Sequence, residues 1–468
     1  MKSFFPFDKF RAGQSEILEI IESNWDKYDV IVVRAPVGFG KSPIASTIQA
    51  RELDAGNGCC IVVPNNLLRE QYLEDYPDMI TIKRQDEYWI EQYKMTEAAF
   101  RKKIYKWGPK DSEYTRDYRA VRRKGTPVVA NYYTYLAHKL QRNTLIVDEA
   151  HSLLGTLQDL SAKRIWKHEY RYPDDARSFY DLLQWVGSNP SDSKLKRLRG
   201  VLESNSKSTL LRFANEPYRG EWKDCLKLLP LNVSDLPNPF WGSKVDKIVL
   251  MSATIGPMDI EKMGLSNRRV LYLDVPSPIP VDQRPIHFQP VGNMSFATQN
   301  DNLPDLAAKL IQLADSQPGK GFVHAPYNMA SKLSIYLKDD DRFMFHNRGN
   351  KKEQYKRFYA LPSSSNAVMV GSGMTEGLDL KYEVAQWQAL TKVPYPSLSD
   401  PAMRHLAEDE PDYYNWLVSR DVMQASGRIC RGPDDTGSTF LLDSQFDIWY
   451  NKYKSSLPSW FTDAMKGI

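Results

Sequence analysis

Cysteine is scarce in this chain, with only four residues among 468. Cys59 and Cys60 are adjacent, whereas Cys225 and Cys430 each lie far from any other cysteine. This distribution lacks the ligand spacing that a structural metal site needs. We therefore expect a protein of a reducing compartment, which we take to be the cytoplasm.

Long apolar runs and a strong excess of one charge are also missing. No segment approaches the ~20 apolar residues of a membrane span, and the N-terminal segment lacks the apolar core and cleavage site of a signal peptide. The formal net charge is only +4, so a nucleic-acid surface must be a local patch. With 42% hydrophobic residues, the chain is long enough for more than one core.

A glycine-containing loop follows an apolar strand expected at residues 30–33. Residues 35–42 read A-P-V-G-F-G-K-S, and the glycines allow backbone N–H groups to turn towards a phosphate at a helix N-terminus. Lys41 would reach the β- and γ-phosphates, and the Ser42 hydroxyl would bind Mg²⁺. Ala35 replaces the usual first glycine, and a simple turn between strand and helix is the alternative. The residues expected to hold ATP here are Pro36, Val37, Gly38, Phe39, Gly40, Lys41 and Ser42.

A D-E-A-H segment follows a second apolar strand, expected at residues 145–147. Open α/β sheets bind ligands at the carboxyl ends of their strands. Asp148 would hold Mg²⁺, and Glu149 would orient and deprotonate the attacking water. His151 would couple the segment to other motifs; a core histidine and a solvated loop are the alternatives. Together, the two segments predict hydrolysis of a nucleoside triphosphate.

Further segments follow in a fixed order along the chain. Gln14, in a helix before the first strand, could read an adenine edge through its amide or could be an ordinary exposed residue. The later segments are Asn131-Tyr132, Met251-Ser-Ala-Thr254, the strand start at residues 321–325, G-S-G-M-T-E-G-L-D-L at 371–380, K-V-P-Y-P-S-L-S-D-P at 392–401 and Q-A-S-G-R-I-C-R at 424–431.

This set of motifs resembles the superfamily-2 helicases, and within them the XPD/DinG-like branch, over residues 10–446. The resemblance implies an α/β fold with two RecA-like parallel-sheet lobes and ATP between them. It also implies two insertions in the first lobe, one at the iron–sulfur-domain position and one that is arch-like. We expect lobe 1 at 1–80, 126–152 and 245–256, the first insertion at 81–125, a helical arch-like insertion at 153–244, and lobe 2 at 257–468.

The resemblance also assigns residues of the second lobe to the nucleotide. Arg428 and Arg431 match the positions of the arginine fingers, with a surface salt-bridge helix as the alternative. Gln424 would lie with the nucleotide, and Glu376 and Asp379 would contact the ribose or relay lobe closure. A guanidinium that reaches across a cleft neutralises charge on the transferring phosphoryl group only when the cleft is closed.

The first insertion is rich in basic and aromatic residues. Between Lys83 and Lys124 there are 13 Lys or Arg and 7 Asp or Glu. Basic residues track phosphates and aromatic rings stack on bases, although the aromatics could instead form a small core under a solvated basic surface. The candidate DNA contacts are Arg101, Lys102, Lys103, Arg122, Arg123 and Lys124, with Arg69, Tyr132 and Tyr133 nearer the lobes by analogy with the family.

The same insertion departs from the family pattern. Cellular members of the branch carry four cysteines here that ligate an iron–sulfur cluster, whereas this chain has no cysteine from Ile61 to Asp224. A cluster needs thiolate ligands, so we expect ATP and Mg²⁺ as cofactors and no cluster.

The function expected from the resemblance is an ATP-dependent DNA helicase that moves 5′ to 3′ on single-stranded DNA. A translocase that strips proteins and barely unwinds is the first alternative, and a binding module with a vestigial ATPase is the second. We expect a monomer acting on single-stranded and forked DNA, with no membrane contact; a loading or repair partner is left open. The short segments before Gln14 and after Phe446 predict a minimal motor.

Overall fold

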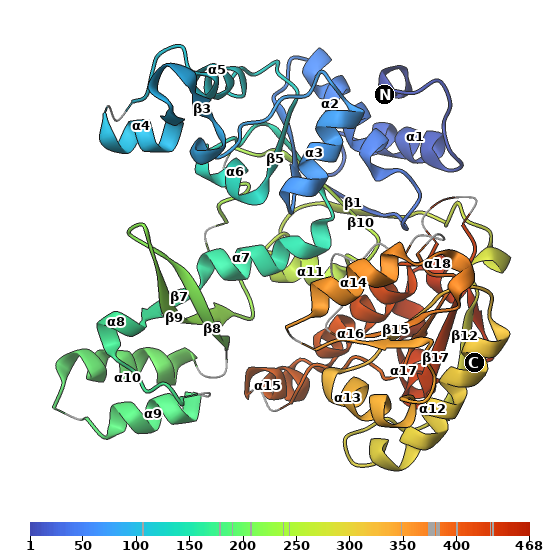
Figure 1. Ribbon diagram of the computed structural model, residues 1–468. Coiled ribbons are helices and arrows are strands. Elements are labelled where there is room, and N and C mark those ends of the chain that lie inside the picture. Colours follow the sequence, from blue (N-terminus) through green and yellow to red (C-terminus); the bar gives the residue numbers. More distant parts are fainter. Residues whose placement is uncertain are drawn as a thin grey trace.

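Two parallel sheets and two smaller projections make up the protein (Figure 1). The computed structural model describes residues 1–104, 107–176, 179–189, 191–205, 208–236, 238–242, 244–347, 349–372, 380, 384–398, 401–430, 432 and 435–468.

The first sheet has the strand order β11-β1-β10-β6-β2-β5, with every neighbouring pair parallel. Apart from the edge strand β11, which is only partly buried, its strands are short apolar runs that are buried on both faces, as is usual for parallel sheets. The strands are β1 (Val30–Arg34), β2 (Cys59–Val63), β5 (Val128–Asn131), β6 (Thr144–Asp148), β10 (Lys247–Ser252) and β11 (Val270–Asp274). The associated helices are α1 (Gln14–Asn24), α2 (Lys41–Asp54), α3 (Asn66–Asp75), α6 (Tyr132–Ala137), α7 (Leu153–Ser161) and α11 (Pro257–Lys262).

Strand β11 corrects one expected boundary. The sequence placed residues from 257 onwards in the second lobe, but β11 pairs with β1 in the first sheet, from Val30↔Val270 to Arg34↔Asp274. An edge strand of five residues carries no local mark of the sheet that it joins, because pairing is decided by contacts distant in sequence. The first sheet therefore extends at least to Asp274.

The second sheet has the order β14-β15-β13-β16-β17-β12-β18 and is also parallel. Its strands are β12 (Ile286–Gly292), β13 (Gly321–His324), β14 (Phe343–Phe345), β15 (Val368–Gly371), β16 (Trp387–Leu390), β17 (Ser438–Asp443) and β18 (Met465–Lys466). Its helices are α12 (Gln299–Ser316), α13 (Tyr327–Tyr336), α14 (Lys351–Ala360), α15 (Pro401–Asp409), α16 (Pro411–Ser426), α17 (Gln445–Tyr453) and α18 (Ser459–Thr462). The expected α/β fold with two parallel-sheet lobes is confirmed.

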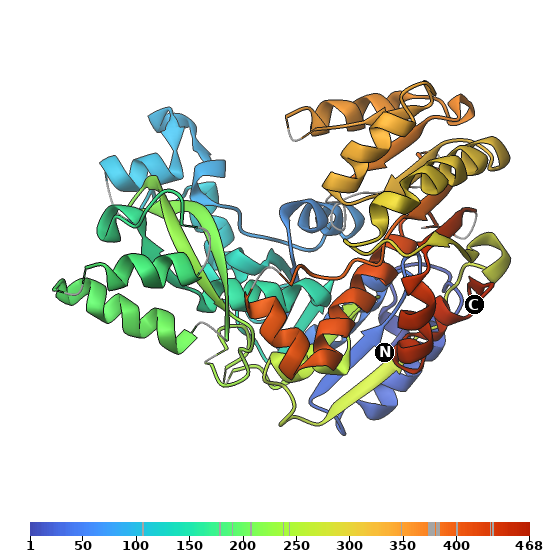
Figure 2. The same cartoon turned by 90° about the horizontal axis from the view of Figure 1, so that it is seen from below.

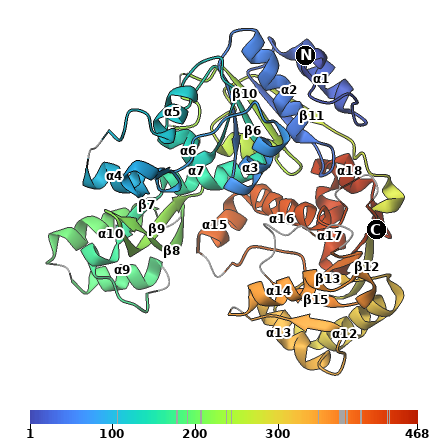
Figure 3. The same ribbon diagram turned by 45° about the horizontal axis from the view of Figure 1, so that its top comes forward.

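Helix α16 joins the two lobes (Figure 3). The Trp416 ring lies against Gly256 of lobe 1, where an added Cβ would come within 2.5 Å of it. The indole Nε1 of Trp416 donates a hydrogen bond of 2.8 Å to Asp259 of α11. Ile260 and Met263 share one hydrophobic core cluster with Trp416, so the lobes have a common apolar contact beside the polar one.

The first insertion contains β3 (Trp89–Ile90), β4 (Met95–Thr96), α4 (Glu97–Lys103) and α5 (Glu113–Ala120). Tyr88, Phe100 and Tyr114 are buried, so for these three rings the alternative of a small aromatic core is correct. The Tyr88 hydroxyl donates to Asp117 at 2.8 Å, and the Arg101 guanidinium lies 4.8 Å from the centre of the Tyr114 ring. These contacts order the described part of the insertion without a thiolate ligand.

The second insertion is only partly helical. Helices α8 (Lys167–Tyr170), α9 (Phe179–Gly187) and α10 (Ser193–Asn205) pack beside an antiparallel sheet of β7 (Lys163–Trp166), β8 (Thr209–Tyr218) and β9 (Glu221–Pro230). The expectation of a helical insertion is therefore wrong for residues 209–230. Arg219 and Gly220 both have positive φ, 50° and 90°, as a two-residue hairpin turn requires, but Arg-Gly is a weaker turn signal than Asn-Gly.

Both insertions project on the same side of the molecule, away from the second sheet (Figure 2). A partly buried charge network fixes the sheet of the arch-like insertion to α7, because Lys227 of β9 bonds to Asp159 of α7 and to Glu216 of β8. None of the described helices combines the length and the apolar character that crossing a bilayer demands.

Candidate nucleotide site and nucleic-acid surface

The glycine-containing loop at residues 35–42, called the phosphate loop below, connects the end of β1 to the start of α2. The N-terminus of α2 therefore points its backbone N–H groups at the loop. Gly38 and Gly40 have φ of 84° and 82°, a left-handed conformation that favours glycine. A Cβ on Gly40 would also lie 2.6 Å from the Gln14 amide. Both glycines are therefore required by the shape of the loop as well as by access for a phosphate.

Gln14 is a clamp on this loop in the structure. Its side chain is 1% exposed, and its Nε2 donates to the carbonyl oxygens of Phe39 at 2.9 Å and Gly40 at 3.2 Å. Its Oε1 accepts from the Arg11 backbone at 2.8 Å. The alternative of an ordinary exposed residue is wrong, and contact with adenine stays a prediction that requires the amide to exchange these partners.

The D-E-A-H residues meet the phosphate loop at the carboxyl end of β6. Lys41 Nζ lies 3.4 Å from Glu149 Oε1. His151 Nδ1 lies 2.9 Å from Ser252 Oγ and 3.4 Å from the second Glu149 oxygen. His151 thus connects the D-E-A-H segment to Ser252 at the end of the neighbouring strand β10.

The two carboxylates have opposite electrostatic environments. Burial raises the pKa of Asp148 to about 6, and the charge of Glu149 acts in the same direction. For Glu149, burial opposes ionisation, but the charges and hydrogen bonds of Lys41 and His151 together hold its pKa well below the usual range. Glu149 is therefore ionised near pH 7, whereas Asp148 is a buried carboxylate that a cation would stabilise.

Tyr72 is a residue of the site that the sequence motifs did not predict. Its hydroxyl donates to Asp148 Oδ2 at 2.8 Å, while Asp148 Oδ1 accepts from the Glu149 backbone at 2.9 Å. Burial raises the pKa of the Tyr72 phenol, and Ser42 is among the groups that act on it. Ser42, Tyr72 and Asp148 therefore form one cluster, and no local motif in α3 marks the tyrosine.

Ser42 and Asp148 supply oxygen ligands of the kind that Mg²⁺ prefers. Burial of Asp148 next to Glu149 leaves excess negative charge, which fits a divalent cation. Among the residues that the structure describes, no group of three or more His, Cys, Asp or Glu is arranged to hold a metal ion. All four cysteines are buried and free. The absence of an iron–sulfur cluster stays a prediction.

Replacing Asp148 with asparagine is expected to stabilise the nucleotide-free protein at pH 8. The unfolded carboxyl titrates near 3.8 and the folded one near 6, so the folded state loses stability as pH rises through this window. Above this pH window, the ionised Asp148 lowers the free energy of unfolding by about 3 kcal/mol. Thermal unfolding without Mg²⁺ should show a higher midpoint for D148N at pH 8, and the gap should close towards pH 4. Asp8→Asn, at an exposed carboxylate, is the control; a D148N midpoint below wild type at pH 8 would contradict the expectation.

The Q-A-S-G-R-I-C-R motif that begins at Gln424, called the sixth motif below, approaches the phosphate loop from the second lobe. Gln424 Nε2 donates to Thr254 Oγ1 at 3.2 Å. A Cβ on Gly427 would lie 3.8 Å from Val37 Cγ2, and Arg428, the next residue, is 5% exposed. The end of α16 thus lies at the loop that is expected to hold ATP. Glu376, Asp379 and Arg431 lie outside the described residues.

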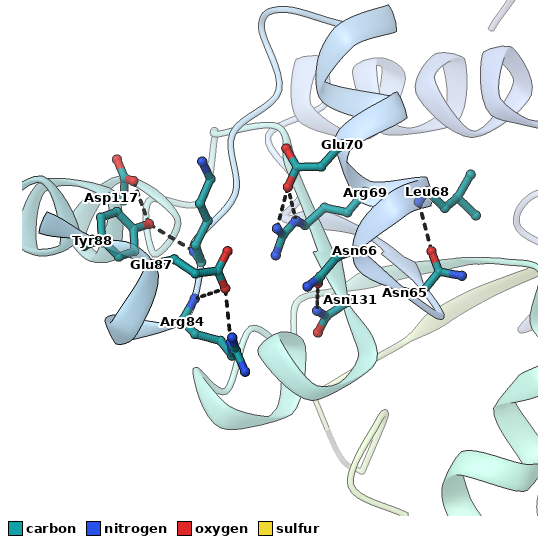
Figure 4. A network of polar contacts seen from close by, with 11 residues as sticks. Asn65, Asn66, Leu68, Arg69, Glu70, Arg84, Glu87, Tyr88, Asp117 and Asn131 are labelled. Atoms are coloured by element: carbon teal, nitrogen blue, oxygen red, sulfur yellow. Dashed lines mark hydrogen bonds and ion pairs between the residues drawn. The ribbon is translucent and has the colours of Figure 1, made fainter. Parts of the chain in front are cut away.

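Two of the expected DNA contacts, Arg69 and Tyr132, are buried; Figure 4 shows Arg69 beside Glu70. Arg69 is 1% exposed and pairs with Glu70, because it shares with Tyr72 the face of α3 that packs on the sheet. Tyr132 is also 1% exposed; its hydroxyl lies 3.2 Å from Ser152 Oγ, and its ring packs edge-on against Phe240. Neither residue can meet DNA in this conformation, and both expectations are corrected.

The remaining DNA candidates divide by exposure. Arg101 is held inside the first insertion by Glu97 at 2.7 Å, so it is structural in this conformation. Tyr133 is 57% exposed. The exposed basic candidates of the insertion are Lys102, Lys103, Arg122, Arg123 and Lys124.

A cavity of about 480 Å³ lies where the two lobes meet the arch-like insertion. Tyr133 and His151 line it from lobe 1, Arg212 from β8, and Arg420 and Gln424 from α16. Because β8 also contacts α15, the cavity joins elements that are distant in sequence. It brings the exposed Tyr133 to the same space as residues of the D-E-A-H segment and the sixth motif.

Two family models match the chain. The "Helicase C-terminal domain" model covers residues 310–464, and the "Type III restriction enzyme, res subunit" model covers residues 8–173.

Curated relatives share modest identity with the chain. The ATP-dependent DNA helicase YoaA of Escherichia coli (strain K12) is 23% identical over 266 residues, which are 50% of this chain and 40% of that protein. Regulator of telomere elongation helicase 1 of Mus musculus is 30% identical over 142 residues, 26% of this chain and 12% of that protein. The matches thus span less than half the length of these relatives.

Solved structures share the fold over nearly the whole chain. The S. tokodaii Xpd4 structure superposes with a TM-score of 0.59 at 14% identity, covering 97% of this chain and 99% of that one. An XPD helicase structure superposes with a TM-score of 0.61 at 15% identity, covering 96% of this chain and 98% of that one.

Proposed function

Because the chain belongs to the superfamily-2 helicases of the XPD/DinG-like type, we propose that it is an ATP-dependent DNA helicase. One observation carries the proposal. The phosphate loop, the D-E-A-H segment and the end of α16 converge from two lobes, with Lys41 3.4 Å from Glu149 and Gly427 facing Val37.

The proposed hydrolysis begins with a change of partner at Lys41. In the structure its ammonium faces Glu149; a bound triphosphate would compete for this cation through its β- and γ-oxygens. Glu149 would then lose the charge that lowers its pKa and become a better base for the attacking water. Mg²⁺, held by Ser42 and Asp148, would neutralise charge on the phosphates. His151 would keep Glu149 oriented through its contact with Ser252.

The proposed coupling to movement lies at the lobe contact. Arg428 would stabilise the transferring phosphoryl group from lobe 2, so hydrolysis would require the end of α16 to face the loop of lobe 1. The same helix lines the cavity shared with Tyr133. A change in lobe position would therefore move a DNA strand that lies near Tyr133, and this coupling would be the basis of stepping.

We propose four units for this motor: lobe 1, extended to include β11; the insertion at 81–125; the arch-like insertion at 153–244; and lobe 2. Movement would be 5′ to 3′ on single-stranded DNA, with the first insertion separating the strands at a fork. In the described part of that insertion, aromatic, acidic and basic side chains would provide the order that a cluster provides elsewhere.

Strand displacement on forked duplexes tests the proposal directly. Duplexes with a single 5′ or a single 3′ tail are compared with ATP and Mg²⁺, beside a Lys41→Ala variant. We expect unwinding from the 5′ tail only, and its loss in K41A. DNA-stimulated ATP hydrolysis without displacement would instead favour a translocase, and the absence of both in the wild type would overturn the proposal.

The exposed lysines at the end of α4 are expected to contribute to DNA affinity. Each phosphate contact with single-stranded DNA changes the slope of log K against log salt by about 0.7, so Lys102→Ala/Lys103→Ala should lower the slope by about 1.4 if both lysines engage. Fluorescence anisotropy with a labelled oligonucleotide at several salt concentrations measures it. Lys338→Ala, at an exposed lysine of lobe 2, is the control. An unchanged slope would show that the end of α4 does not contact the DNA.

A further inference from the structure

Two polar side chains, His324 and Gln388, bond to each other across neighbouring strands of the second sheet. His324 is the last residue of β13. Gln388 lies in β16 between Trp387 and Ala389, which are both fully buried. Gln388 is itself 0% exposed. A buried amide is costly unless its donors and acceptor are satisfied, so the partners of Gln388 indicate why an amide stands at this position.

The Gln388 amide is satisfied on both sides. Its Nε2 lies 2.9 Å from the Ala425 carbonyl oxygen, 3.2 Å from that of Ser426 and 2.9 Å from Thr439 Oγ1. The two carbonyls fix the amide orientation, because a flipped amide would set Oε1 against two acceptors. Oε1 lies 3.0 Å from His324 Nε2, which must then carry the proton.

His324 is suited to hold this orientation without adding charge. Burial lowers the pKa of His324 to about 4. The charge of Arg428 lowers it further, whereas the hydrogen bond to Gln388 acts in the opposite direction. The ring is therefore neutral near pH 7, with one N–H that donates to Gln388.

The two carbonyl oxygens that accept from Gln388 belong to the last turn of α16, where intrahelical donors run out. Gly427 follows directly and its N–H donates to Met423 at 3.1 Å. Arg428 comes next, and its N–H donates to the Ala425 carbonyl at 3.2 Å, which Gln388 also binds. The amide thus holds the backbone that carries Arg428.

We propose that Gln388, oriented by His324, is a positioning residue for ATP hydrolysis that fixes the end of α16 so that Arg428 meets the nucleotide. This inference rests on the proposed function. It does not make Gln388 a catalytic residue, because among the described residues its side chain bonds to protein groups of lobe 2.

The test compares two buried amides of the same region. Gln388→Met keeps the length of the side chain and removes the donors to α16. Gln386→Met is the matched control, because Gln386 is also buried, at 7% exposed, and its Oε1 accepts from the Lys320 backbone at 2.6 Å, away from α16. Gln388→Glu adds a pH readout, because its carboxyl can donate to the carbonyls only when protonated.

We expect Q388M to lower kcat for DNA-stimulated ATP hydrolysis about 10- to 100-fold, the cost of a small misplacement, with KM for ATP little changed. Q386M should retain wild-type kcat. Q388E should gain activity relative to wild type as pH falls from 8 to 6, because burial favours the protonated carboxyl. Such a pH profile would not arise from a general loss of stability.

The outcomes separate the inference from the proposed function. A wild-type protein without DNA-stimulated hydrolysis would overturn the proposed function itself. Hydrolysis by Q388M at the Q386M level would overturn the role of Gln388 and leave the function standing. Should Q388M fail to fold by circular dichroism, Gln388→Asn, which keeps an amide but shortens its reach, replaces it with the same two outcomes.

Discussion

Replacing Arg428 with alanine is expected to lower kcat for DNA-stimulated ATP hydrolysis by about 10³- to 10⁵-fold, the range measured for arginine fingers in other nucleotidases. Arg428 is 5% exposed and follows Gly427, which faces Val37 of the phosphate loop. A guanidinium placed there loses its water shell before the reaction, so its full charge is available to the transferring phosphoryl group. Binding of ATP should be affected much less than turnover.

Steady-state hydrolysis and binding of a fluorescent ATP analogue measure the two effects separately. Arg428→Lys should recover little, because an ammonium cannot reproduce the planar fork of the guanidinium. Arg404→Ala removes an exposed arginine of α15 that donates to the Leu398 carbonyl oxygen, and it should hydrolyse ATP like the wild type. An R428A protein with half the wild-type kcat would refute the role of Arg428.

Replacing Glu149 with glutamine is expected to lower kcat by about 10²- to 10⁴-fold, the usual contribution of a general base. The amide is the same size, so the contact with His151 can persist while the basic oxygen is lost. Removing the charge also frees Lys41 from its partner at 3.4 Å. ATP should therefore bind E149Q at least as tightly as the wild type, and the complex should accumulate unhydrolysed.

Single-turnover hydrolysis and nucleotide binding distinguish this outcome from unfolding. Glu261→Gln, an exposed carboxylate of α11, is the matched control and should change neither quantity. A loss of ATP binding in E149Q would show that Glu149 shapes the phosphate loop rather than acting on the water. Turnover at the wild-type rate would remove it from the chemistry altogether.

The motifs near the nucleotide could be read from the chain because each is contiguous and follows a short apolar strand. The phosphate loop and the D-E-A-H segment lie where β1 and β6 end, and parallel strands bring such ends to one edge. The family resemblance then indicated the facing motif at the end of α16. Tyr72 and Gln388 could not be found this way, because each acts through a partner more than thirty residues away.

Surface residues were predicted less well, for a related reason. Arg69 and Tyr132 follow the strands expected to border the DNA, but helices α3 and α6 turn these side chains towards the sheet. Arg101 belongs to a basic cluster, yet Glu97 and Tyr114 hold it inside the insertion. Knowing where a helix begins does not show which of its side chains face the solvent, because that depends on which face packs against the core.

By itself, the sequence determined the fold class, the order of the motifs and the chemical groups available at the nucleotide, because these depend on residue type and on spacing along a few residues. The tertiary structure alone decided which sheet β11 joins, which basic and aromatic residues reach solvent, and which side chains hold Asp148 and Arg428 in place. Those outcomes depend on the burial of groups brought together from distant segments, and burial sets both the free energy and the pKa of a polar group.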